Sequence, residues 1–199
     1  MKNLKKYRWW VPGALVLLAV ILLFSRCSGS DPGVPTLIVE TPPKLSASQT
    51  EEVTLDVTVS TLGEARYPAM SMSISFDPSR LEFLGVEEGN IFILCGESSN
   101  GQQLPDWSCN VENSNDTGLI NILYLDMTGG KNAFSQELLA EDYNVVLRLK
   151  FRLRGSVRPG DVLDLILEDA VFAASDENES LAMTTDTLKT KNGRIVIGD

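Results

Sequence analysis

The sequence predicts an all-β fold, an antiparallel β-sandwich with jelly-roll topology and eight or nine strands. Two observations predict it. Apolar side chains recur at every second position in run after run, which is the period of a strand that buries one face. Glycine, proline, asparagine and aspartate separate these runs, as turns between short antiparallel strands require. No helical period of comparable length competes with this pattern.

The alternation can be followed along the chain. In residues 53–59 valine and leucine alternate with threonine and aspartate, and in residues 70–76 methionine, isoleucine and phenylalanine alternate with serine. A tight turn at residues 77–80 then leads into residues 81–83. Residues 129–143 break the pattern, and we expect a loop with one helical turn there. Further strands are predicted over residues 119–125, 145–153, 162–167 and 194–197.

The N-terminal residues predict export or anchoring. Residues 1–8 carry four basic side chains and no acidic one, and residues 9–24 form an uncharged run that is closed by Arg26 and Cys27. The basic flank is expected to stay in the cytoplasm under the positive-inside rule, which puts the rest of the chain outside. We therefore divide the chain into a signal-anchor or transmembrane segment (1–27), a short Ser/Gly/Pro linker (28–34) and a β-sandwich domain (35–199).

Three fates of the N-terminal segment stay open. Its uncharged run of about 16 residues is longer than most signal-peptide cores and shorter than the ~20 residues of a full span. An uncleaved single-pass anchor would hold the domain on the outside of the cell membrane, and cleavage within residues 28–30 would secrete it. Lipidation of Cys27 is the third route, for which the preceding Arg26 is a poor fit.

The charge balance weighs against a nucleic-acid ligand. The formal net charge is −10, and the chain after residue 26 carries 12 basic against 27 acidic residues. Binding to phosphate groups needs the opposite sign. We expect this acidity to serve solubility outside a cell rather than a specific basic partner.

The residue types also weigh against catalysis. Histidine is absent, which removes the commonest general base, the usual partner in a hydrolytic triad and the commonest transition-metal ligand. No glycine-rich phosphate loop follows a predicted strand. A glycosidase would need two carboxylates, and no pair can be singled out among 27 acids. We therefore predict no enzyme, no catalytic residue, no metal-ligating residue and no cofactor.

Two loop features leave alternatives open. Cys95 and Cys109 lie in the same Ser/Asn/Gly-rich segment, where they either form a disulfide, which export permits, or stay separate thiols. Residues 176–179, with the sequence DENE, either hold calcium or form a solvated acidic turn. The spacing lacks the alternation and the glycine of an EF-hand loop, which favours the solvated turn.

Five segments, taken in order, resemble the cohesin family. One is residues 70–83, MSMSISFDPSRLEF, which resemble the family's third strand with its aromatic-Asp-Pro turn and the Leu-Glu after it. Another is residues 118–130, GLINILYLDMTGG, which resemble its central strand and Gly-containing loop. The next long strand, the late Phe-Ala segment and the closing strand are matched by residues 145–151, by 168–173 (EDAVFA) and by 192–197 (NGRIVI). The resemblance covers about residues 35–199.

The resemblance implies a nine-stranded jelly roll that binds a dockerin, a small calcium-loaded helical module commonly carried by a polysaccharide-degrading enzyme. The calcium would belong to the partner. The implied role is that of a non-catalytic scaffold or anchor, as in a cellulosome. Carried over by position, the docking face holds Ala69, Ser71 and Ser73 on the third strand, Asn121, Leu123, Leu125 and Asp126 centrally, and Leu181 and Met183 late. Well-known cohesins place an Asn and an Asp where this chain has Ala69 and Ser71, which weighs against a conventional dockerin.

The alternation in residues 119–125 agrees in part with this docking face. If the isoleucines and Tyr124 point inward, the strict period of two turns Leu123 and Leu125 outward. An exposed leucine pair is what a helix-docking surface needs. The alternative is a strand that is buried on both faces.

Two other functions compete with protein binding. A carbohydrate-binding module commonly uses the same type of sandwich and stacks sugars on exposed rings, and a pilin-like or surface-structural subunit would also carry a hydrophobic N-terminus. The rings available for polysaccharide binding are Trp107, Tyr67, Tyr124 and Tyr143, of which only Trp107 lies in a polar loop. A row of coplanar exposed rings would favour the sugar binder. A flat, weakly polar sheet face with outward leucines would favour the protein binder.

Overall fold

The computed structural model describes six stretches of the chain, residues 33–46, 52–92, 107–140, 142–155, 157–175 and 181–198. The chain divides into two units, residues 1–33 and residues 34–199, and the strands named below belong to the second. The predicted anchor 1–27, with Cys27, and most of the linker 28–34 lie outside the described residues. Within the six described stretches, no helix is both long enough and apolar enough to cross a membrane.

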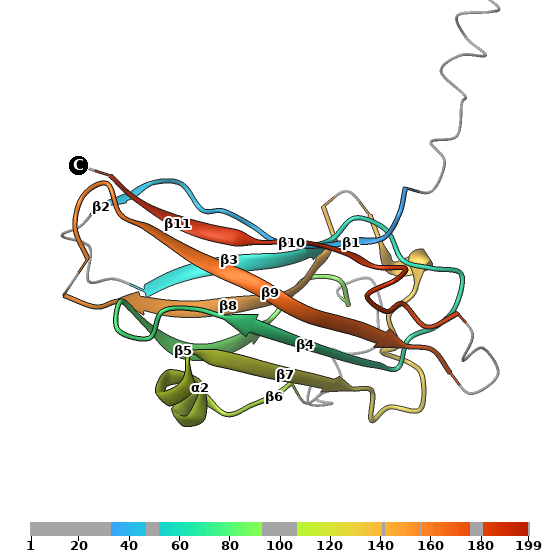
Figure 1. The fold of residues 1–199 in the computed structure, drawn as a ribbon. Helices are drawn as coiled ribbons and strands as arrows, with labels where there is room; N and C mark the ends of the chain where they lie inside the picture. Colours follow the sequence, from blue (N-terminus) through green and yellow to red (C-terminus); the bar gives the residue numbers. More distant parts are fainter. Residues whose placement is uncertain are drawn as a thin grey trace, which may run out of the picture. The chain divides into compact units, whose positions relative to one another are not determined.

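Two sheets form the two layers of the domain (Figure 1). The five-stranded sheet consists of β1 (Thr36–Val39), β3 (Glu52–Val59), β5 (Leu81–Glu88), β8 (Val145–Leu153) and β10 (Lys189–Lys191). Its order is β10-β1-β3-β8-β5. The six-stranded sheet consists of β2 (Leu45–Ser46), β4 (Ala69–Ser75), β6 (Ser108–Cys109), β7 (Leu119–Leu125), β9 (Val162–Ala173) and β11 (Gly193–Gly198). Its order is β2-β11-β9-β4-β7-β6.

The predicted all-β sandwich is confirmed. Among the described residues, eight strands have four residues or more, and β2, β6 and β10 add three strands of two or three residues. Such short strands contain too few alternations to be recognised in a sequence. The helical turn expected within residues 129–143 is the 3-10 helix η3 (Gln136–Leu138). Most neighbouring strands pair antiparallel, whereas β1 with β10 and β2 with β11 pair parallel, and both parallel pairs join segments from opposite ends of the domain.

One hydrophobic core lies between the sheets. Burial alternates along most of β8, and its Phe151 is fully buried. The Phe151 ring contacts Phe76 and Phe83, with ring centroids 5.5 and 5.4 Å apart. A second aromatic group is formed by Tyr67, Phe134 and Phe172. Aromatic pairs at such separations contribute about 0.5–1.5 kcal/mol each beyond the burial of their area.

The helix α2 (Val111–Thr117) was absent from the sequence prediction because its residues, VENSNDT, are polar and show no apolar period. Short-range contacts set its two ends. The side chain of Asn110 accepts a hydrogen bond from the N–H of Asn113, and Gly118 adopts a φ of 72° after the last turn. These are a typical N-cap and a typical glycine C-cap.

Asn115 attaches α2 to the edge strand β5. Its side-chain amide donates to the carbonyl oxygen of Phe83 and its Oδ1 accepts from the N–H of Phe83, both at 2.8 Å. The amide therefore satisfies backbone groups of an edge strand in the way a neighbouring strand would. In Figure 1, α2 lies beside β5 and β7, which it contacts.

Replacing Gly118 by alanine is expected to destabilise the domain. A Cβ at this position would lie 2.7 Å from the carbonyl oxygen of Phe76, and the left-handed backbone alone costs an L-residue about 1–2 kcal/mol. Gly155→Ala is the matched control, because a Cβ there meets nothing within 4 Å. The midpoint of unfolding in urea, measured by circular dichroism, should be lower for Gly118→Ala than for the unaltered chain. For Gly155→Ala it should be unchanged. Equal midpoints for the two variants would contradict this backbone geometry.

Candidate functional site

The outer face of the five-stranded sheet is covered by ion pairs. Basic side chains of β8 alternate along this face with acidic side chains of β3 and β5. The pairs are Arg148–Asp56 at 3.0 Å, Lys150–Glu52 at 3.1 Å, Lys150–Glu87 at 3.0 Å, Arg152–Glu82 at 3.3 Å and Arg152–Glu52 at 3.5 Å. Hydrogen bonds to Glu87 and Glu52 raise the pKa of Lys150. Because these charges neutralise one another, the face offers a partner little uncompensated charge.

The outer face of the six-stranded sheet has a different composition, with small side chains between larger ones. β4 contributes Ala69, Ser71, Ser73 and Ser75. Opposite them on β7 stand Leu125, Leu123, Asn121 and Leu119, and on β9 stand Ala173, Val171, Asp169 and Ile166. We call the outward residues of these three rows the serine face. The side chains of the central β4 row are small, and most of those in the β7 and β9 rows on either side are larger.

Large apolar side chains are exposed on and beside the serine face. Leu123 is 49% exposed, Leu125 45% and Ile166 42%. Met127, just after β7, and Val162, at the start of β9, are also exposed. Five of the seven large exposed hydrophobic residues in the described stretches therefore lie on this sheet or directly after β7. Apolar exposure gathered in this way is typical of an interaction surface.

Burial alternates along β7 as the period of two predicts. Its two isoleucines and Tyr124 are buried, whereas Asn121, Leu123 and Leu125 are exposed. The Tyr124 ring packs against Phe134, with centroids 4.6 Å apart, which fixes the inward side of the strand. The alternative of a strand buried on both faces is wrong.

Some of the polar residues predicted for the site make hydrogen bonds within the chain. The hydroxyl of Ser73 donates to Oδ1 of Asn121 at 2.8 Å, across the β4–β7 pair. Asp126 is half-buried after β7, and its Oδ1 accepts from the N–H of Thr128 at 2.7 Å. Asp126 therefore stabilises the turn at the end of the strand. Ser71 is exposed and stands opposite Leu123. Among the described residues, its hydroxyl makes no side-chain hydrogen bond like that of Ser73.

The two late residues predicted for the site are separated by the structure. Leu181 is exposed, and its carbonyl oxygen accepts from the hydroxyl of Tyr67 at 3.2 Å. Met183 is only 3% exposed, because its backbone pairs with Phe172 and its side chain joins the core. The prediction that Met183 lies on the docking face is wrong. A single bridged residue pair has no alternation by which a sequence could reveal it.

The sequence analysis missed the β9 row of the serine face. Leucine recurs at every second position, at residues 163, 165 and 167, and all three leucines are buried. This alternation in the sequence was enough to predict that Ile166 points outward. Beyond them the alternation fails, because the β4–β9 register shifts between Ser73 and Ile74. Glu168 has no opposite residue on β4, and both Glu168 and Asp169 are exposed. This irregularity is a β-bulge, and it could not be recognised from the period of two.

No exposed aromatic platform is found among the described residues. Tyr67 and Tyr124 are fully buried, and Tyr143 is half-buried. Trp107 is half-buried too, and its ring packs on Tyr124 with centroids 4.8 Å apart. A row of coplanar exposed rings, the feature that would favour a sugar binder, is thus missing from this part of the chain.

The remaining site predictions fall largely outside the described residues. Cys109 is a half-buried thiol, and burial raises its pKa. Cys95 and the acidic segment 176–179 lie outside the described stretches, so the disulfide and the calcium turn stay predictions. Within those stretches, no group of three or more His, Cys, Asp or Glu side chains is arranged to hold a metal ion.

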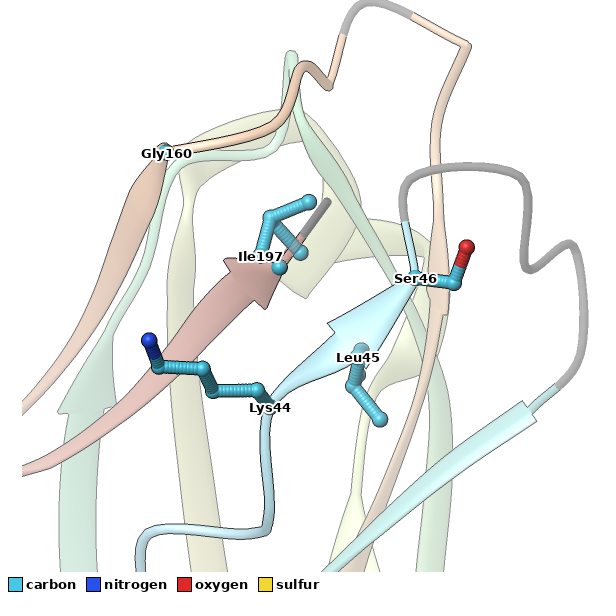
Figure 2. A pocket seen from close by; sticks show the side chains of 6 residues that line it. Lys44, Leu45, Ser46, Gly160 and Ile197 are labelled. Atoms are coloured by element: carbon cyan, nitrogen blue, oxygen red, sulfur yellow. The ribbon is translucent and has the colours of Figure 1, made fainter.

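Two hollows lie on the described surface. One, of about 540 Å³, is lined at the ends of β2 and β11 by Lys44, Leu45, Ser46, Gly160, Ile197 and Gly198. Figure 2 shows the side chains of Lys44 and Ser46 pointing in opposite directions, so they do not converge on one ligand. The other, of about 370 Å³, adjoins the serine face at the start of β9. Its lining includes Ser75, Arg80, Val162, Asp164 and Ile166.

The domain is a two-sheet β-sandwich with one ion-paired face and one weakly polar face with exposed leucines. The chain belongs to the cohesin family, because the family model of the Cohesin domain matches residues 40–192. The resemblance inferred from the sequence is confirmed. No curated protein matches the sequence.

Solved cohesin structures share the fold. The third cohesin of ScaC from Acetivibrio cellulolyticus, in complex with the ScaB dockerin, has a TM-score of 0.58 at 12% identity, over 83% of this chain and 99% of that one. The OlpA cohesin of Clostridium thermocellum, in complex with Doc918, has a TM-score of 0.57 at 18% identity, over 83% and 99%. A non-cellulosomal cohesin from the archaeon Archaeoglobus fulgidus has a TM-score of 0.51 at 16% identity, over 83% and 91%.

Truncation of adjacent residues of β7 should change the free energy of unfolding to very different extents. Ile122→Ala is expected to lower the free energy of unfolding by about 2–5 kcal/mol, because the side chain is buried. Leu123→Ala should change it by less than about 0.5 kcal/mol, because the side chain is half exposed on the sheet face. Denaturant titration of both variants measures the difference. A large loss for Leu123→Ala would show that this leucine serves the core.

Proposed function

We propose that this chain is a non-catalytic protein-binding module that docks a dockerin-type partner on the serine face. The observation that carries the proposal is the outward pair Leu123 and Leu125 beside the small side chains of β4. A helix can approach a sheet closely over serine and alanine, and the two leucines then supply apolar area to bury.

Membership of the cohesin family supports this choice of partner. The ScaC and OlpA cohesins were solved in complexes with dockerins. The ion pairs on the opposite sheet support the choice of face, since disrupting them would cost a partner desolvation of charged groups. The chain needs no cofactor of its own in this proposal, and the calcium would be bound by the dockerin.

We further propose that residues 1–27 tether the domain to the cell membrane and that the domain lies outside the cell. In this arrangement the protein would anchor dockerin-bearing proteins, such as polysaccharide-degrading enzymes, at the cell surface. The basic flank of residues 1–8 and the uncharged run of residues 9–24 support the tether.

Cell fractionation tests the tether. The full chain is expected in the membrane fraction, where protease added outside the cell should cleave it. A variant without residues 9–24 should remain in the soluble fraction of the cytoplasm. A Cys27→Ser variant separates a lipid anchor from a spanning anchor, because only the lipid anchor needs this thiol. Recovery of an N-terminally shortened chain in the medium would contradict the tether and indicate cleavage within residues 28–30.

The docking proposal is tested by a pull-down from the organism's secreted and surface proteome, with residues 31–199 as bait. Calcium-dependent capture of dockerin-bearing proteins is expected, with loss of capture in chelator. Leu123→Glu and Leu125→Glu should each weaken binding by about 2 kcal/mol or more, which is roughly thirtyfold in Kd, because each buries a charge at the centre of the contact.

Val34→Glu is the matched control for these two variants, because Val34 is 50% exposed but lies outside the six-stranded sheet. It should bind like the unaltered bait. Equal capture by all variants would contradict docking on the serine face. Retention of the bait on insoluble polysaccharide without any captured protein would instead support the sugar-binding alternative and direct mutagenesis to Trp107.

A further inference from the structure

We propose that the partner docks a helix along β4 with apolar side chains over the β7 flank and basic side chains over the β9 flank of the serine face. The inference rests on the proposed function and specifies the chemistry of its partner. It follows from an asymmetry of charge across the face, from a β-bulge and from the spacing of three strands.

Charge is distributed unequally across the serine face. The outward residues of β4 and β7 are small, apolar or amide side chains, and none of them is ionisable. The β9 strand instead exposes Asp164, Glu168 and Asp169. The β7 flank of the face therefore carries no charge, whereas the β9 flank carries three carboxylates among its apolar side chains.

The bulge in β9 produces the densest part of the acidic flank. In a regular strand two consecutive residues face opposite sides, so one of Glu168 and Asp169 would point into the core. The register shift lets both lie exposed, with Asp169 opposite Ser73. Bulges commonly turn a side chain toward a functional surface. Here the bulge places two adjacent carboxylates beside the row of β4.

These two carboxylates have no basic partner in the described part of the chain. Oε1 of Glu168 accepts a hydrogen bond from the hydroxyl of Ser75 at 2.7 Å, and this neutral contact leaves its charge uncompensated. No ion pair joins Glu168 or Asp169 to a described Lys or Arg. Asp164 stands opposite Arg194 across the β9–β11 pair, so its charge is the more screened of the three. Charge complementarity thus calls for lysine or arginine on the partner.

The spacing of the strands fits a single helix. Neighbouring strands lie about 4.8 Å apart, so the β7 and β9 flanks are roughly 10 Å apart, which is the diameter of a helix with its side chains. The outward row of β4 runs from Ala69 to Ser75, about 20 Å at ~3.3 Å per residue. A helix of about 13 residues covers that length. Its two sides then lie over the leucines and over the carboxylates.

The hollow at the start of β9 favours a long side chain at that end of the helix. Its lining includes the exposed apolar side chains of Val162 and Ile166, and Asp164 lies beside them. The guanidinium of Arg80, which also lines the hollow, is already paired with Asp161. The methylene stem of a lysine or arginine can pack on the apolar part while its charge reaches the carboxylate.

Selection from a displayed library of dockerin-type modules with randomised helix flanks tests the inference. The full chain in mild detergent is the target, and calcium is present. Selected modules are expected to carry lysine or arginine along one flank of the binding helix. For these modules, the variant Glu168→Gln/Asp169→Asn should lower the association rate constant about tenfold at low salt, and the difference should shrink in high salt.

The matched control is Asp116→Asn/Asp142→Asn, which removes the same charge from two exposed positions outside the serine face. It should change the association rate less than twofold, and circular dichroism should show both variants folded. If selected modules bind all forms equally while Leu123→Glu still removes binding, the inference is wrong and the docking proposal stands. If no module is selected, the docking proposal fails and the inference with it. If the chain alone forms dimers that Glu168→Gln/Asp169→Asn dissociates, the face covers a second copy and the inference is overturned.

Discussion

The burial of alternate side chains in one core constrains most features of this domain. Each residue of β7 that packs inward, such as Tyr124 against Phe134, forces its neighbours Leu123 and Leu125 to the surface. The same constraint turns the serines of β4 outward, because Met72 and Ile74 occupy the core side. The outward direction of the serine face is therefore a consequence of how the core is filled.

The two outer faces of the sandwich differ in the side chains that they expose to solvent. On the five-stranded sheet, alternating charges from β3, β8 and β5 satisfy one another and favour solubility. On the six-stranded sheet, small side chains and exposed leucines leave apolar area uncovered. This difference would let a partner distinguish one face of the sandwich from the other.

The β-bulge of β9 adds polarity to the weakly polar face. By bringing Glu168 and Asp169 to the same side, it places charge along one flank while β7 keeps the other flank apolar. An apolar flank contributes affinity through burial, and a charged flank contributes orientation and association rate. Together they would let one sheet fix the direction as well as the position of a docked helix.

The sequence by itself determined the class of fold and most of its strands, because apolar side chains recur at every second position in one run after another. For Leu123 and Leu125 it left two alternatives, and the structure decided that both leucines point outward. It also determined the family, through five short segments in order. Only the tertiary structure decided that Met183 belongs to the core, that β9 supplies the second flank of the serine face and that β2, β6 and β10 complete the sheets. Each of these depends on a pairing between separate segments of the chain, and the period within one segment carries no information about the register of such a pairing.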